Sequence, residues 1–135
     1  MTDHENALQK ALIAHLKGDA ALQALLGDPA RIWDQPAAEP LFPHLLIGRC
    51  ESRPVAADGC GVEHNLTLTC ASRFGGTEEA KAVSAAVRAR LFEAQLTADG
   101  VRTVSLRVAF SDVFRSPDLR RTWAVIRVRA VTEEI

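Results

Sequence analysis

The chain has 135 residues, of which 47% are hydrophobic and 24% are charged, and its 16 basic and 17 acidic residues leave a formal net charge of -1 at pH 7. This length and composition predict a single domain over residues 1–135 and exclude disordered, collagen-like and coiled-coil proteins. A charge this close to zero gives no global attraction to nucleic acid or to an anionic membrane.

The N-terminal region has the pattern of an interrupted helix. Apolar residues recur at helical spacing over residues 6–16, which predicts one amphipathic stripe. Gly18 interrupts the pattern, and Asp19 is a suitable N-cap for a second piece over residues 20–26 that ends at Gly27. We therefore expect one helix with a break.

A proline-rich connection and a hairpin follow. Three prolines between residues 35 and 43 exclude a central strand, so this stretch is predicted to be extended. One strand is expected from His44 to about Arg53, ended by Pro54, and a second from Val62 to Ser72. Together they predict a β-hairpin with a long tip.

The C-terminal half begins with another helix. A glycine pair turns the chain, Thr77 is a suitable N-cap, and the apolar stripe runs over residues 83–94. Strands are then expected from Thr103 to about Phe114 and from Arg121 to Thr132, separated by a break at Pro117.

The alternation of apolar and more polar residues within the strands predicts a sheet with one apolar and one half-polar face, because successive side chains of a strand point to opposite sides. Two substantial helices can cover only one of them. The sequence therefore predicts an α+β fold of two layers: a mainly antiparallel sheet of about four to five strands, with two helices packed on one face and the other face left for solvent or a partner. The predicted apolar set is Leu66, Leu68, Cys70, Val104, Leu106, Val108, Phe110, Ala124, Ile126, Val128 and Ala130.

Membrane and disulfide signals are missing from the sequence. No apolar run reaches the roughly 20 residues that span a bilayer, and the N-terminus has no basic stretch typical of a signal peptide. We therefore expect a cytoplasmic location. Cys50, Cys60 and Cys70 form no CxxC pair, so we expect reduced, mostly buried thiols and no disulfide framework or zinc ribbon.

The sequence contains none of the common phosphate-binding, zinc-protease or serine-hydrolase motifs. Cys60 and His64, close to Asp58, could form a nucleophile and base, but they lie at a predicted loop that would position them poorly. The turn before Thr77 could bind an anion, although a plain helix cap explains it equally well. The four histidines have no metal-ligand spacing. We predict no catalytic, cofactor-binding or metal site.

Basic residues gather in the C-terminal hairpin. Residues 101–135 contain seven basic and four acidic residues, whereas residues 1–48 contain three basic and six acidic residues. Tryptophan and arginine are enriched at protein interfaces. The predicted protein interface therefore comprises Arg115, Arg120, Arg121, Trp123 and Arg127. A solvated hairpin end, or burial of the tryptophan under a loop of the same chain, would give the same pattern.

The chain contains, in this order, the segments HLKGDAALQALLG, ARIWDQP, PLFPHLLIG, GVEHNLTLTCASRFGGTEEAKAVSAAVRARL and RRTWAVIRVRAV. Their order and spacing over nearly the whole chain resemble those of the tail-terminator, or tail-completion, proteins of long-tailed bacteriophages and of related gene-transfer agents. None of these segments is a catalytic motif. The resemblance therefore depends on all of them together.

The resemblance implies an α+β protein without enzymatic activity that forms a ring, usually of six copies. Such a ring sits on the tail tube protein, stops tube polymerisation and presents a surface to the head-completion (stopper) protein, and DNA passes through its lumen. It implies no membrane partner and no cofactor. The protein would assemble in the cytoplasm and then remain at the head–tail junction of the particle.

Two other functions remain open at this point. One is a small cytoplasmic enzyme or ligand-binding module that uses Cys60 and His64. The other is a nucleic-acid-binding regulator that uses the C-terminal arginines, which predicts a steep loss of affinity with added salt.

Overall fold

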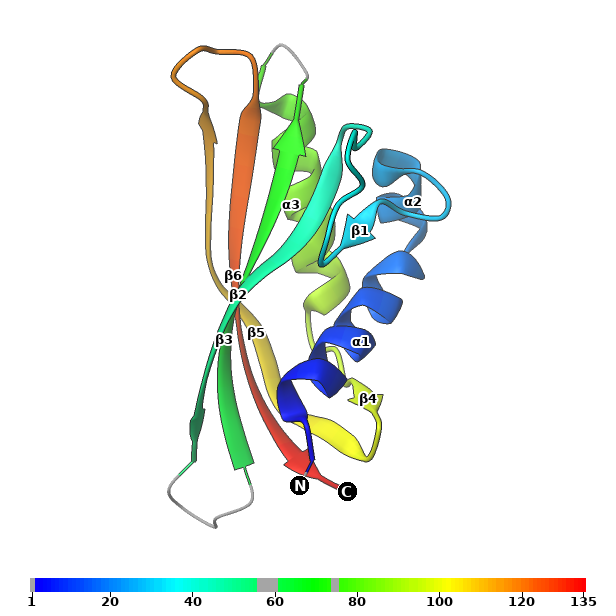
Figure 1. Ribbon diagram of the computed structural model, residues 1–135, viewed down its shortest axis with the longest axis vertical. Helices are drawn as coiled ribbons and strands as arrows, with labels where there is room; N and C mark the ends of the chain where they lie inside the picture. Colours follow the sequence, from blue (N-terminus) through cyan, green and yellow to red (C-terminus); the bar gives the residue numbers. More distant parts are fainter. Residues whose placement is uncertain (1, 56–60, 74–75) are drawn as a thin grey trace.

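The computed structural model describes residues 2–55, 61–73 and 76–135. A long, strongly twisted sheet carries the helices on one face, and none of the described helices covers the opposite face, which we call the open face (Figure 1). The turn between the last two long strands lies at one end of the molecule, and both termini lie at the other (Figure 1).

The described residues form three helices, which lie on the covered face: α1 (His4–Lys17), α2 (Ala20–Leu26) and α3 (Glu78–Leu91). The predicted break is confirmed, because α1 ends at Gly18 and the Asp19 carboxylate accepts a hydrogen bond from the backbone N–H of Leu22 at 3.0 Å. Thr77 is the N-cap residue of α3 as predicted, but its side chain makes no capping hydrogen bond.

The described residues form six strands in the order β1-β2-β3-β6-β5-β4. The α+β class is confirmed, but the expected numbers of strands and helices are wrong. Two of the strands are only two residues long, too short to show an alternation of apolar and polar residues. One of these two strands pairs in parallel with its neighbour, so the sheet is mixed. The interrupted helix forms two separate helices. The strands are β1 (Ile32–Trp33), β2 (His44–Pro54), β3 (Gly61–Ser72), β4 (Thr97–Ala98), β5 (Val101–Arg115) and β6 (Thr122–Glu134).

The core lies between the helices and the covered face of the sheet. Leu12 and Leu16 of α1 and Val83 of α3 are fully buried against it. The predicted alternation is confirmed on β3 and β6, whose core-facing residues are Leu66, Leu68, Cys70, Ala124, Ile126, Val128 and Ala130.

Strand β5 departs from the predicted alternation. Leu106 and Val108 pack against the core as expected, but Val104 and Phe110 are 60% and 51% exposed. The register of β5 against β6 shifts between Thr103 and Ser105 and again between Val108 and Phe110. Each extra residue reverses the alternation that follows it. The predicted apolar set is therefore wrong at these two positions.

None of the described helices is both long enough and apolar enough to cross a membrane.

Candidate functional site

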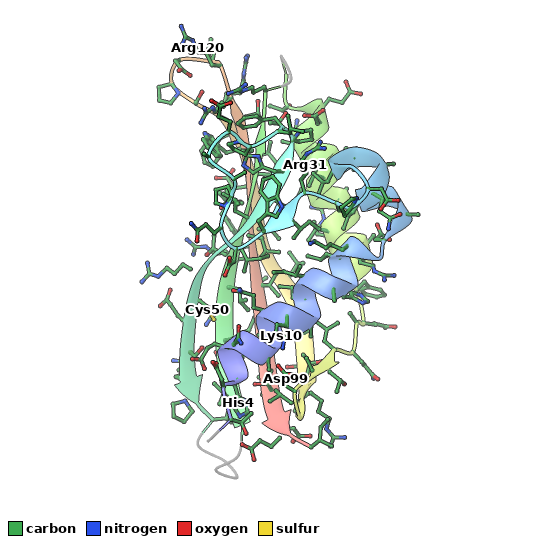
Figure 2. All side chains as sticks on the ribbon, turned by 45° about the vertical axis from the view of Figure 1, so that its right-hand side comes forward. His4, Lys10, Arg31, Cys50, Asp99 and Arg120 are labelled. Carbon is green, nitrogen blue, oxygen red and sulfur yellow. The ribbon has the colours of Figure 1, made fainter. Side chains whose placement is uncertain are left out.

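The tip of the β5–β6 hairpin is held by hydrogen bonds within the turn. The backbone N–H of Ser116 donates to the carbonyl of Arg121 at 2.8 Å, and the Asp118 carboxylate accepts from the Ser116 hydroxyl and from the backbone N–H of Arg120. These bonds lower the pKa of Asp118. Arg115 donates to a backbone carbonyl of the same turn. The turn therefore presents Arg120, which is exposed, at the extreme end of the molecule (Figure 2).

Arg121 ends the turn and Trp123 follows it on β6, and both side chains lie on the open face. They line a depression of about 670 Å³ between the proline-rich connection and the sheet. We call it the Phe42 hollow; its lining consists of residues 38–42, His44, Leu46, Ala71, Arg73, Arg121 and Trp123. Trp123 is half-buried. Its own chain thus covers it in part and leaves the rest facing the hollow.

Aromatic rings and guanidinium groups converge on Phe42. The ring centroids of Phe42 and His44 are 4.8 Å apart, and the Cζ atoms of Arg73 and Arg121 lie 4.1 and 5.3 Å from the Phe42 centroid. Nδ1 of the buried His44 donates to the carbonyl of Leu41, which fixes the orientation of this imidazole. Both arginines therefore lie within cation–π range of one ring.

Phe42, His44 and Arg73 are not among the predicted interface residues. The prediction treats the connection that contains Phe42 only as an extended segment, and no sequence pattern links His44 or Arg73 to it. The signal in the sequence was a leucine and a phenylalanine placed between Pro40 and Pro43. Apolar residues in a connection with fixed φ angles indicate a segment that packs against something rather than a solvated loop.

Arg127 lies farther along the open face. It is the register partner of Phe110, and its Cζ atom is 5.7 Å from that ring centroid. The next arginine on β6, Arg129, pairs with Glu63 at 3.2 Å, and Arg53 pairs with the same carboxylate at 3.1 Å. The hydrogen bond from Arg53 and that from Arg129 lower the pKa of Glu63. The predicted interface residues thus run from the hairpin tip to the middle of the open face instead of forming one cluster.

His64 occupies a buried position on the covered face and is fully shielded from solvent. Its Nδ1 shares a hydrogen bond with the Ser52 hydroxyl and its Nε2 shares one with the Thr132 hydroxyl, both at 2.8 Å, and Nδ1 of His4 bonds the same Thr132 oxygen. Burial lowers the pKa of His64. Both nitrogens are occupied, so the imidazole joins the start of α1 to the sheet and is not open to a substrate.

The other members of the predicted catalytic pair, Asp58 and Cys60, lie outside the described residues. The expectation of buried thiols holds for Cys70, whose pKa burial raises to about 12, but Cys50 is exposed. Across residues 2–55, 61–73 and 76–135, no three His, Cys, Asp or Glu side chains are grouped so that they could hold a metal ion.

The chain is similar to known proteins over nearly its whole length. Residues 10–133 match a protein family described as tail completion protein gp17. A chain of a solved structure described as "Virion of native gene transfer agent (GTA) particle" is similar, with a TM-score of 0.88 and 25% sequence identity over 98% of this chain and 99% of that chain. No curated protein matches the sequence significantly.

Proposed function

This chain belongs to the tail completion protein gp17 family, and on that premise we propose that it forms a ring, of six copies, on the end of a phage or gene-transfer-agent tail tube. It is a structural protein of a phage-like tail. In this proposal the ring stops growth of the tube and joins the tail to the head-completion protein. The observation that carries the proposal is the family match, supported by the full-length likeness to a chain of a gene-transfer-agent virion.

The edges of the sheet support a ring. In the described part of the chain, β4 pairs with only the first two residues of β5, and β1 pairs with only two residues of β2. Long stretches of both edge strands therefore have unpaired backbone groups that can accept another strand. Three antiparallel pairings separate β2 from β5, so these edge strands run in opposite directions. A β5 edge could continue antiparallel pairing along the β2 edge of the next copy.

Two different edges on one subunit suit a head-to-tail contact, which closes into a ring when the rotation between subunits allows it. Such a contact leaves the hairpin tip and the open face available for other partners. We assign Arg115, Arg120, Arg121, Trp123 and Arg127 to contacts with the tube protein or the head-completion protein. The basic groups of the open face would contact DNA where this face lines the lumen.

We also propose that the chain is not an enzyme, and that it assembles in the cytoplasm before it becomes part of the particle. The occupied nitrogens of His64 support the first statement, because a general base needs an accessible nitrogen within reach of a substrate.

The test measures tail completion in particles assembled with a variant of this chain whose charges at the hairpin tip are reversed. We expect Arg120→Glu with Arg121→Glu to abolish tails joined to heads while the isolated protein stays folded, because both side chains are exposed. The matched control is Lys81→Glu with Arg88→Glu, which makes the same charge change on the exposed side of α3. Particles that lack the chain should have tails of irregular length that do not join heads; uniform, joined tails would contradict the proposal.

A further inference from the structure

We infer that the Phe42 hollow binds a segment of a neighbouring protein in which a carboxylate stands next to an apolar side chain. The inference rests on the proposed function only for the identity of that neighbour, since Arg121 and Trp123 belong to the proposed interface. The chemistry of the ligand follows from the hollow itself.

The two arginines of the hollow provide the anion-binding part. A guanidinium that stacks on an aromatic ring uses its face, so its N–H donors along the edge stay available for a carboxylate, which they bind in bidentate fashion. Arg73 and Arg121 both line the hollow and lie near the Phe42 ring, and they flank the register pair Ser72 and Thr122 of β3 and β6. Neither forms an ion pair with another residue in the part of the chain that the structure describes. A carboxylate between them would relieve the repulsion of two like charges.

The remaining walls provide the apolar part. Phe42 and the half-buried Trp123 face the hollow together with Leu46, and the exposed Leu41 forms its rim. Aromatic side chains in a concave site are the usual anchors of protein interfaces. The volume of about 670 Å³ falls in the range of roughly 300–1,000 Å³ that is typical of ligand pockets. The hollow can therefore hold an acidic residue and the apolar residue beside it.

A peptide carboxylate fits this site better than a nucleic acid. The hollow is a local depression, whereas a phosphate backbone needs a continuous basic track. The lining also contains Glu39, whose negative charge would repel a polyanion. The occupant we infer is thus an acidic–apolar peptide segment.

The experiment measures binding of a fluorescein-labelled peptide, GELEFG, to the full chain by fluorescence polarisation. The matched peptide GQLQFG has nearly the same shape without the two glutamate carboxylates, both peptides end in a C-terminal amide, and a labelled oligothymidylate is the nucleic-acid probe. The hollow variant is Arg73→Gln with Arg121→Gln. The control variant is Arg49→Gln with Arg88→Gln, which removes two exposed positive charges elsewhere. A further variant, Phe42→Leu, keeps an apolar side chain but removes the ring. Circular dichroism checks that each variant is folded.

We expect the hollow variant to bind GELEFG at least about tenfold more weakly than the natural chain, and the control variant to differ by less than about twofold. GQLQFG should also bind at least about tenfold more weakly, and Phe42→Leu should weaken GELEFG about threefold. The inference is overturned when GELEFG does not bind, when the hollow variant keeps full affinity, when GQLQFG binds equally well, or when oligothymidylate occupies the site more tightly than the peptide. Because the probes bind the isolated chain, these outcomes are independent of whether Arg120→Glu with Arg121→Glu blocks tail completion.

Discussion

The two faces of the sheet are built from the same strands but carry different side chains: the covered face is mostly apolar, and the open face carries arginine and aromatic side chains. On β6, Ala124, Ile126 and Val128 are fully buried under the helices, while Trp123 and Arg127 alternate with them on the open face. Polar groups on the covered face are paired inside the molecule, as around His64. On the open face, guanidinium groups lie over exposed or half-exposed aromatic rings. One face therefore stabilises the domain and the other is available to partners, and substitutions should separate in the same way.

The largest effect on the free energy of unfolding is expected on the covered face of β3, and a neighbouring residue on the open face provides the control. Leu68→Ala removes a fully buried side chain from the core and should lower the free energy of unfolding by about 2–5 kcal/mol. The control Thr67→Ala, on the open face, should change it by less than about 1 kcal/mol. Urea denaturation measures both. Equal losses at the two positions would contradict the separation of the faces.

A smaller effect is expected at the polar cluster of the covered face. Thr132→Val keeps the shape of the side chain but leaves Nδ1 of His4 and Nε2 of His64 without their shared partner. We expect a loss of about 1–3 kcal/mol in the free energy of unfolding, the cost of buried polar groups that lose their hydrogen bonds. Thr69→Val on the open face is the matched control. A loss in the free energy of unfolding for Thr69→Val as large as that for Thr132→Val would contradict this interpretation.

The smallest effect is a dependence of stability on pH. The pKa of His64 is lower in the folded protein than in the unfolded chain. As the pH falls, the imidazole therefore takes up a proton in the unfolded chain before it does so in the folded protein. The contribution of the neutral His64 to the free energy of unfolding is therefore fully present above the ordinary histidine pKa of about 6.5. It is lost as the pH falls from that value towards the lower pKa of the folded protein. Denaturation at a series of pH values between about 8 and 5 should show the loss, and His64→Gln should reduce it. An unchanged pH profile in that variant would assign the dependence to other groups.

Local features of the fold were predictable from sequence, and features set by strand pairing were not. The cap at Asp19 and the alternation on β3 and β6 depend on neighbouring residues, so the sequence predicts them directly. The bulges of β5 exist only against β6, and two-residue strands are defined only by their partners. For the candidate site, composition indicated Arg121 and Trp123. Phe42 and Arg73 could not be assigned to it, because only the tertiary fold brings these distant segments together.

The register shift in β5 near Phe110 has an evolutionary consequence. Beyond it, Val113 pairs with Ala124 and packs against the core, while Phe110 and Phe114 pair with Arg127 and Trp123 on the open face. Loss of the one extra residue, a change of a single codon, would leave these pairs on the same faces but would straighten the strand, because a bulge bends and twists the strand that contains it. Related proteins could therefore redirect the hairpin tip by such a deletion while the two faces keep their side chains.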